Sequence, residues 1–355
     1  MKRGLLFGLL FFIGINYCYA STGTATSYIL MDMDSGMVIQ SKNKDTPMLI
    51  ASITKIMTCI LAIENGNLDE IVVVDEVINQ SYGSGIYISI GEEISLRDLL
   101  YGLMLRSGND AALMVARYIS GSVDDFVSLM NEKAKELGMR NSKFYNPSGL
   151  DNDIGNLSTV YDMAILTSYA MKNSNYQDIV KTKKYVAKTN LKTYVWHNKN
   201  KLLSYEYITG GKTGYTEKAK RTLVSTGSQD GMNFVVVTIK DSDDWNTHKS
   251  LYEYAFENYQ NVKVLDKNSF MVIGDNYYDK LYIKDDVYVT LKKGIREDLI
   301  NHIKLEKKDV YLSGIKVGTS NIYLGDKLIA QTDIYAKKYV ENETIFDKIR
   351  KWFNK

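Results

Sequence analysis

One apolar helix constrains this sequence more than any other stretch. Its side chains recur at the three- and four-residue spacing of an α-helix until Asn65-Gly66 ends the pattern; they are Ile53, Ile56, Met57, Ile60 and Leu61. Such a helix must bury one face, so its first turn is held against the core. Ser52 and Lys55 lie at that turn. Because they are three residues apart on one face, the lysine amine can reach the serine hydroxyl.

This pair can act as an activated nucleophile without a histidine. The unpaired amides of the first turn favour a developing negative charge, and a neutral lysine amine can remove the serine proton. Ser-x-x-Lys occurs three times in the chain, however, and the copies at Ser41 and Ser313 have no apolar helix beneath them. The structural alternative for Ser52 is an N-cap serine followed by a solvated lysine.

Two later motifs carry residues of the same chemical kind. Ser107-Gly108-Asn109 lies between two apolar helical stretches, where a tight turn can present both side chains together. Lys212-Thr213-Gly214 occurs once, followed by Tyr215, and its glycines would let a ligand backbone lie along an edge strand. The structural alternatives are an interhelical turn and a surface strand with a solvated lysine.

The length and element pattern predict two domains. A chain of 355 residues exceeds the usual size of a single core. Up to residue 261, helices are enclosed between strands at both ends, which predicts an α+β sandwich with an antiparallel sheet. A short strand is expected at residues 86–90. From 262 to 340 the helical period gives way to strands and turns, which predicts a smaller β-rich domain.

The two ends of the chain predict export and membrane contact. Residues 1–20 have a basic start, a short apolar stretch and small residues up to Ala20, which is typical of a secretory signal peptide; an uncleaved anchor is the alternative. Residues 341–355 predict an amphipathic helix that lies at a membrane surface, or else packs on the β domain; its apolar face is Ile345, Phe346, Ile349, Trp352 and Phe353.

Composition excludes several classes of function. Without residues 1–20 the chain has 42 basic and 42 acidic side chains, which argues against nucleic acid as a partner. Cys59 is then the only cysteine, and its helix predicts a core position. No phosphate loop, dinucleotide fingerprint or metal-ligand spacing occurs, so we expect no cofactor and no metal. A Ser-His-Asp triad stays open, with His197, His248 and His302 but no Gly-x-Ser-x-Gly elbow.

Together the three motifs, in this order, resemble the penicillin-binding proteins and serine β-lactamases. The sequence is most similar to the D-alanyl-D-alanine carboxypeptidases among the low-molecular-mass penicillin-binding proteins. Further segments carry that likeness: residues 146–150, 158–164, 200–203 and 210–216. The resemblance implies a β-lactamase/transpeptidase-like sandwich followed by a β domain and an amphipathic tail. One departure is Asn156-Leu157, just before Ser158, where many members carry a histidine; we expect it to affect local structure more than chemistry.

The resemblance also implies a role for each motif residue. Ser52 would attack the carbonyl between the two terminal D-alanines of a peptidoglycan stem peptide, with Lys55 as the base. Ser107 would relay a proton to the departing amine, and Asn109 would bind the peptide backbone. The substrate side would comprise Lys212 and Thr213 for the terminal carboxylate, with Lys240 as a further candidate cation, the adjoining Gly214, and the backbone N–H groups of Ser52 and Tyr215 as an oxyanion hole.

The implied enzyme is an exported serine carboxypeptidase at the outer face of the bacterial cytoplasmic membrane, acylated by β-lactams. Two alternatives remain. A class A β-lactamase requires a Glu-x-x-Leu-Asn loop, and the nearest segment, residues 136–141, does not match it. A penicillin-binding sensor or wall-binding protein would be acylated without turnover.

Overall fold

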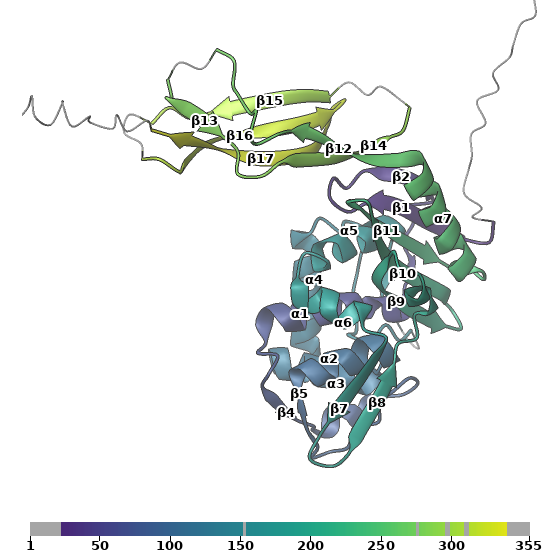
Figure 1. Cartoon of the computed structure of the whole chain (residues 1–355). Helices are drawn as coiled ribbons and strands as arrows, with labels where there is room; N and C mark the ends of the chain where they lie inside the picture. The colour runs from purple at the N-terminus through teal and green to yellow at the C-terminus, as the bar shows by residue number, and fades with distance from the viewer. Residues whose placement is uncertain (1–22, 152–153, 275–276, 295–298, 309–311, 339–355) are drawn as a thin grey trace, which may run out of the picture.

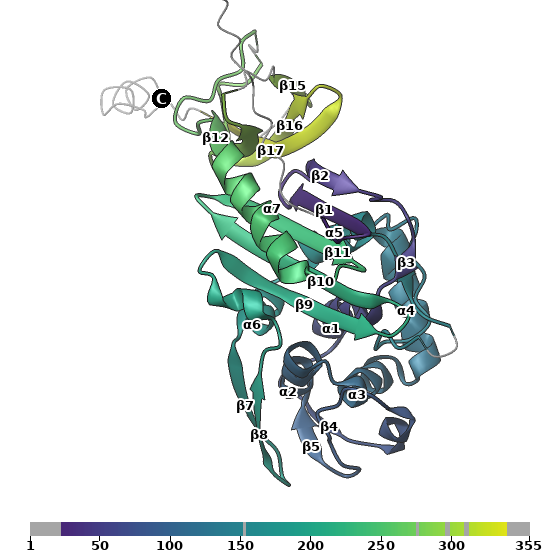
Figure 2. The same ribbon diagram turned by 90° about the vertical axis from the view of Figure 1, so that its right-hand side faces the viewer.

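The computed structural model describes residues 23–151, 154–274, 277–294, 299–308 and 312–338 (Figure 1). A larger N-terminal domain combines helices with a sheet, and an elongated β domain lies beyond one end of that sheet (Figures 1 and 2). The predicted signal peptide and the predicted C-terminal amphipathic helix both lie outside the described residues. In the described part of the chain, none of the helices is long and apolar enough to cross a membrane.

A five-stranded antiparallel sheet, in the order β2-β1-β11-β10-β9, forms the centre of the larger domain. Its strands are β1 (Ser27–Asp32), β2 (Val38–Lys42), β9 (Ile208–Thr216), β10 (Lys220–Gln229) and β11 (Met232–Ile239). The first strand pairs with one of the last, with Ile29 opposite Val237. Strand β9 therefore lies at an edge of the sheet, where one side is free of strand pairing.

The two faces of this sheet bury different helices. Along β11, Val235 and Val237 contribute to the core under the helical layer, whereas Phe234 and Val236 pack toward α7 (Asp244–Asn258). The alternation follows from the two-residue period of a strand. The helical layer comprises α1 (Lys55–Asn65), α2 (Leu96–Tyr101), α3 (Asn109–Ser120), α4 (Val123–Glu136), α5 (Val160–Ala170) and α6 (Ser174–Lys181).

Short strands and side-chain caps complete the helical layer. Ser95, Ser122 and Thr159 each accept a hydrogen bond from the backbone N–H three residues later, which fixes the starts of α2, α4 and α5. The short antiparallel pairs are β3 (Met48–Leu49) with β6 (Leu157–Ser158), β4 (Ile71–Val73) with β5 (Glu93–Ser95), and β7 (Lys184–Lys188) with β8 (Thr193–His197).

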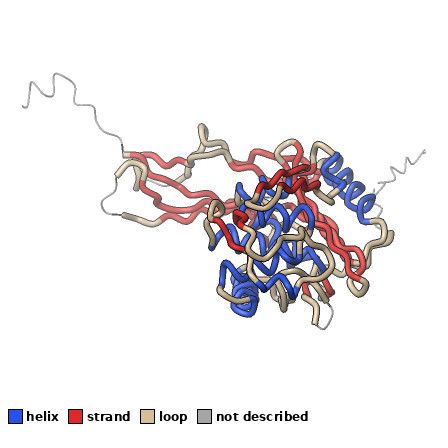
Figure 3. Tube along the Cα trace, turned by 90° about the horizontal axis from the view of Figure 1, so that it is seen from below, coloured by secondary structure: helices blue, strands red, loops and turns tan. Residues whose placement is uncertain are grey.

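The C-terminal domain is built from strands and loops, whereas the helices gather in the larger domain (Figure 3). The strands are β12 (Tyr259–Leu265), β13 (Lys280–Tyr282), β14 (Val287–Lys292), β15 (Leu299–Leu305), β16 (Ile315–Leu324) and β17 (Lys327–Lys337). Strand β12 follows α7 directly and pairs with β14. Lys327 Nζ donates to the carbonyl oxygen of Gly36 at 2.6 Å, which joins this domain to the β1–β2 turn.

The predicted α+β domain and β-rich domain both form, but the strand expected at residues 86–90 does not. Ser95, Ser122 and Thr159 cap their helices, and β10 and β11 form a hairpin between the helical layer and α7. Residues 86–90 do not form a strand, because the N–H groups of Ile86 and Tyr87 donate to the Asp110 carboxylate instead. Helix α6 was not predicted from the sequence.

The turn before α1 is held by a loop from a distant part of the chain. Residues Ala51–Thr54 form a 3₁₀ turn, and Ala51 has a positive φ of 48°. Gly149 lies against this turn: a Cβ built there would be 1.9 Å from the Ala51 carbonyl oxygen, and its own φ is +87°. Only glycine fits this position, so the loop and the turn fix one another.

We expect Gly149→Ala to lower the free energy of unfolding by about 2–4 kcal/mol, since it combines a backbone clash with an unfavourable φ. Urea denaturation followed by the fluorescence of the buried Trp196 measures the change. Gly138→Ala is the matched control, because φ is +73° there but no atom lies within 4 Å of the added Cβ. Its expected loss is about 1 kcal/mol. Equal losses in the two variants would contradict the close approach at Gly149.

Candidate active site

Ser52 lies in the 3₁₀ turn that leads into α1, half-buried at the sheet-facing end of the helix. The apolar residues that follow it are buried, as their spacing requires. Lys55 is the first residue of α1 and is fully buried. The serine and the lysine therefore share one face of a rigid helix start.

The Lys55 amine connects three separate segments. Its Nζ donates to Asn109 Oδ1 at 2.7 Å and to the Ser148 carbonyl oxygen at 2.5 Å, and it lies 3.1 Å from Ser52 Oγ. Asn109 Oδ1 and the carbonyl can only accept, so they take two N–H bonds. In a neutral amine the lone pair then faces the Ser52 hydroxyl. The geometry thus suits removal of the serine proton.

The surroundings favour that neutral form. Burial lowers the pKa of the Lys55 amine well below its usual range, and the charges of Lys212 and Lys199 lower it further. Asp110 acts in the opposite direction as the smallest contribution. The pKa of Lys212 is lowered to about 7, by burial first and then by the charge of Lys199. Two ammonium groups in one buried cleft disfavour each other.

Ser107 directly follows the π-helical segment Gly102–Arg106, and Asn109 is the first residue of α3. Ser107 has a left-handed backbone, with φ 66°, and both side chains are buried. Asn109 donates from Nδ2 to the Tyr82 carbonyl oxygen at 2.7 Å, while its Oδ1 accepts from Lys55. Its amide orientation is therefore fixed from both sides.

Strand β9 supplies the opposite wall. Lys212 is buried and donates to Ser107 Oγ at 3.1 Å and to the Thr213 carbonyl oxygen at 2.7 Å. Thr213, Gly214 and Tyr215 face the same cavity as Ser52. A Cβ at Gly214 would lie 2.9 Å from the Ser52 backbone nitrogen, so glycine keeps the space in front of that amide open.

A cavity of about 300 Å³ is lined by Ser52, Ser107, Thr213, Gly214 and Tyr215. Lys55 and Lys212 lie behind this lining, in contact with Ser52 and Ser107, and Asn109 lines a neighbouring cavity with Ser148.

The lining of the Ser52 cavity also holds groups that the sequence did not reveal: Ser84, Lys199, Arg221, Thr222, Asp244 and Trp245. Arg221 donates to Asp244 from Nε at 3.1 Å and from a terminal nitrogen at 2.5 Å, and lies 5.4 Å from the centre of the Trp245 ring. Lys240, the candidate cation, instead lines a neighbouring cavity with Tyr215 and Arg221.

Two hydrogen-bond networks fix the loops that border the site. Asn156 accepts from the Tyr145 backbone N–H at 2.7 Å, and its Nδ2 donates to Thr54 Oγ1 at 3.0 Å and to the Asn146 carbonyl oxygen at 2.9 Å. It thereby fixes the loop that carries the Ser148 carbonyl. The prediction that Asn156 serves local structure agrees with these contacts. Asp110 fixes the 84–87 loop in the same way, through its contacts with Ile86 and Tyr87.

The structure does not support a Ser-His-Asp triad built on His248. His248 contacts Ser225 Oγ at 2.7 Å and Thr238 Oγ1 at 3.1 Å, and all three side chains are fully buried beneath the sheet. Burial lowers the pKa of His248 to about 3. A substrate has no access to this pair. Among the described residues, no group of three or more His, Cys, Asp or Glu is arranged to hold a metal ion.

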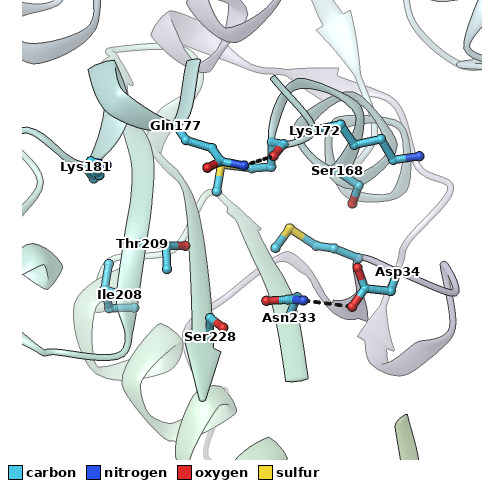
Figure 4. Close-up of a pocket in the computed structure, with 11 residues that line it drawn as sticks. Asp34, Ser168, Lys172, Gln177, Lys181, Ile208, Thr209, Ser228 and Asn233 are labelled. Carbon is cyan, nitrogen blue, oxygen red and sulfur yellow. Dashed lines mark hydrogen bonds between the residues drawn. The ribbon is translucent and has the colours of Figure 1, made fainter. Parts of the chain in front are cut away.

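A larger cavity, of about 500 Å³, lies at the other end of the sheet (Figure 4). It is lined by Ser168, Thr209, Ser228 and other polar side chains, and Asn233 donates to Asp34 at 2.9 Å. None of the predicted catalytic residues reaches it. The convergence of reactive groups, not cavity size, therefore selects the Ser52 cleft.

Comparisons with known proteins agree with this selection. Residues 18–243 match the family model described as D-alanyl-D-alanine carboxypeptidase, and residues 259–342 match the penicillin-binding protein 5, C-terminal domain. The chain is 32% identical to D-alanyl-D-alanine carboxypeptidase DacF of Bacillus subtilis over 80% of this chain and 76% of that one. It is 28% identical to D-alanyl-D-alanine carboxypeptidase DacA of Escherichia coli, over 92% of this chain and 86% of that one.

Two solved structures extend the comparison to three dimensions. Penicillin-binding protein 5 from Haemophilus influenzae aligns with a TM-score of 0.72 at 26% identity, covering 92% of this chain and 99% of that chain. A mutant of the Streptomyces K15 DD-transpeptidase aligns with a TM-score of 0.63 at 32% identity, covering 66% of this chain and 98% of that chain. The first similarity spans both domains, and the second spans two thirds of this chain.

We expect Lys199→Gln to raise the pKa of Lys212 above its value of about 7, and to raise that of Lys55, because it removes a positive charge that disfavours both ammonium forms. NMR titration of ¹³Cε-labelled lysines, assigned with Lys55→Arg and Lys212→Arg, measures both values. Lys201→Gln is the control, since that lysine is exposed and contributes to neither shift. An unchanged Lys212 titration in Lys199→Gln would refute the coupling.

Proposed function

The chain belongs to the D-alanyl-D-alanine carboxypeptidase family of serine peptidases, and from this premise we propose that Ser52 is its nucleophile and Lys55 the base. The fold is the penicillin-binding transpeptidase fold with a C-terminal all-β domain. The enzyme removes the terminal D-alanine of peptidoglycan stem peptides through an acyl-enzyme and is inhibited by β-lactams. One observation carries the assignment: the buried Lys55 amine contacts Ser52, Asn109 and Ser148 at once.

In the acylation step, the Ser52 hydroxyl gives its proton to Lys55 Nζ as Oγ attacks the carbonyl between the two D-alanines. The two fixed acceptors, Asn109 Oδ1 and the Ser148 carbonyl, then hold the ammonium that forms. The carbonyl oxygen becomes an oxyanion, which the backbone N–H groups of Ser52 and Tyr215 stabilise. The open space kept by Gly214 in front of the Ser52 amide supports this role.

The terminal carboxylate binds between β9 and β10. Lys212 supplies buried positive charge, Thr213 a hydroxyl, and Arg221 a guanidinium that Asp244 and Trp245 hold in place. The peptide backbone lies along the unpaired edge of β9, as an added strand, with Asn109 bonded from the other side. Arg221 is a better second cation than Lys240, because it lines the same cavity as Ser52.

Ser107 delivers the proton that the departing D-alanine amine requires. Its hydroxyl faces the cavity and accepts a hydrogen bond from Lys212, so the proton it gives up is replaced from a neighbouring ammonium. The C–N bond breaks and free D-alanine leaves. The proton that Lys55 took from Ser52 then restores the Lys212 ammonium through solvent, which leaves the Lys55 amine neutral. Water hydrolyses the ester between Ser52 and the shortened peptide, with Lys55 accepting the proton of the water and returning it to Ser52 Oγ.

The electrostatics of the cleft favour this enzyme over a β-lactamase. Asp244 is the one acidic residue in the lining of the Ser52 cavity, and Arg221 already binds both of its oxygens. Glu136, in the segment compared with the class A loop, lies at the end of α4 and pairs with Lys133 at 2.9 Å. Neither carboxylate is free to activate a water for rapid penicillin hydrolysis.

The proposed setting is outside the cytoplasmic membrane. Residues 1–20 are proposed as a cleaved signal peptide, and residues 341–355 as a helix that rests on the membrane surface. The proposed serine carboxypeptidase domain spans 21–261 and the β domain 262–340. The end of α7 at Asn258 and the start of β12 at Tyr259 support a division near this boundary.

Ser52→Ala should reduce D-alanine release from a peptide ending in D-Ala-D-Ala to background and abolish covalent labelling by a fluorescent penicillin. The matched controls are Ser41→Ala and Ser313→Ala, in the two other Ser-x-x-Lys copies, which should keep full activity. Peptide turnover with slow penicillin release marks the carboxypeptidase. Fast penicillin hydrolysis would identify a β-lactamase, and labelling without peptide turnover would identify a sensor.

Arg221→Leu should lower kcat/KM for a peptide with a free terminal carboxylate by about 5- to 150-fold, mainly through KM, since it removes a charge-assisted hydrogen bond worth about 1–3 kcal/mol. A peptide with a C-terminal amide supplies the comparison, and wild type and variant should turn it over at similar low rates. Lys240→Leu should leave both substrates unaffected. A loss that is equal for the carboxylate and the amide would exclude the role of Arg221.

A further inference from the structure

The β7–β8 hairpin projects from the larger domain at the end away from the C-terminal β domain (Figures 1 and 2). Its strands pair in register, with Lys184 opposite His197, Val186 opposite Val195 and Lys188 opposite Thr193. Alternate residues of a two-stranded ribbon face opposite sides. The hairpin therefore has an inner face, packed on the domain, and an outer face in solvent.

The inner face is aromatic and also engages the nearby acidic groups. Tyr185 stacks on Tyr101 with ring centres 3.6 Å apart, and its hydroxyl donates to Asp98 at 2.7 Å. The Tyr194 hydroxyl donates to Glu92 at 2.9 Å, and that carboxylate is fully buried. The stacked rings make the hairpin rigid. The two carboxylates face its inner side and do not neutralise the outer one.

The outer face is cationic with an apolar centre. Lys184, Lys188 and His197 flank Val186 and Val195, which are 55% and 53% exposed. Between Asp178 and Glu206 the sequence has seven lysines and no acidic residue. In the part of the chain that the structure describes, the side-chain amines of Lys184 and Lys188 have no hydrogen-bond or ion-pair partner; only their backbones pair, within the hairpin. A rigid surface with unpaired cations is complementary to an anionic ligand.

We propose that this outer face binds the stem peptides of polymeric peptidoglycan that neighbour the one being cleaved. The inference rests on the proposed function, because it takes the cleft to hold one D-Ala-D-Ala end. Neighbouring stems carry free carboxylates for the lysines and alkyl side chains for the valine pair. Lys188 lies four residue steps after Lys184 along the strand, roughly 13 Å, so each lysine meets a different carboxylate.

Continuity with the cleft favours the substrate polymer over a lipid surface. Strand β8 ends at His197, and Lys199, two residues on, lines the Ser52 cavity. A polymer that leaves the cavity past Lys199 therefore meets the hairpin next. The β domain, which leads to the proposed membrane-associating tail, lies at the opposite end of the molecule (Figure 1).

The test compares two double variants with the same change in net charge. Lys184→Glu with Lys188→Glu reverses the hairpin face, and Lys135→Glu with Lys267→Glu reverses two exposed lysines on α4 and after β12. D-alanine release is measured on soluble uncross-linked peptidoglycan strands and on a short peptide ending in D-Ala-D-Ala. Binding to vesicles of phosphatidylglycerol is measured in parallel.

The hairpin variant should lose about tenfold in kcat/KM on the strands, through KM, since two rim charges of about 0.5–1 kcal/mol each are reversed. Its activity on the short peptide should stay within about twofold of wild type, and 1 M salt should remove the difference. An unchanged KM on the strands, an equal loss in the control variant, or a loss of vesicle binding alone would overturn the proposal. If wild type released no D-alanine from the short peptide, the proposed function itself would fail instead.

Discussion

Two lysine amines buried in one cleft are the constraint on which the rest of the structure depends. Lys55 and Lys212 are 0% and 1% exposed, and each unpaired ammonium placed there would cost on the order of several kcal/mol. Uncharged acceptors, and not carboxylates, offset this cost. The Lys55 amine donates to an amide oxygen and a backbone carbonyl, and the Lys212 amine donates to a hydroxyl and a backbone carbonyl. Neutral acceptors bind the N–H groups of the two lysines but add no negative charge that would favour the ammonium forms. A carboxylate at that distance would raise the pKa of Lys55 and keep the amine protonated, so that it could not accept the proton of Ser52.

The acceptors have to be held by other parts of the chain, which explains why the site has so many polar residues behind it. The Ser148 carbonyl points at Lys55 because Asn156 and Asn146 fix the loop, and Gly149 lets that loop lie against the turn that carries Ser52. Asn109 is fixed by Tyr82, and Asp110 holds the 84–87 loop beside it. These side chains are remote in sequence and make their contacts only when the sheet and the helical layer pack together.

This dependence separates what the sequence reveals from what it does not. The Ser52 helix, the three caps and the order of the motifs follow from local spacing, because each signal is contained within a few residues. Residues 86–90 looked like a strand for the same reason, but Asp110, more than twenty residues away, takes two of their N–H groups. The Arg221–Asp244 pair joins β10 to α7 and has no local signature. Local patterns therefore predicted the three motifs, including Lys212 and Thr213, while Arg221, Asp244 and Lys199 were found only in the tertiary structure.

The overall charge balance of the chain likewise does not reveal where its charges lie. Equal numbers of basic and acidic side chains in the chain after residue 20 argue against a nucleic-acid partner, yet residues 179–205 contain seven lysines and no acid. These cations act over different ranges. Lys199, at the cavity, lies close enough to lower the pKa of both buried lysines. Lys184 and Lys188 are in solvent, where salt screens a charge within about 8 Å, so they act on an anion only by direct contact. One lysine-rich segment can therefore adjust the chemistry at its cavity end and hold a polymer along its exposed end, without either effect disturbing the other.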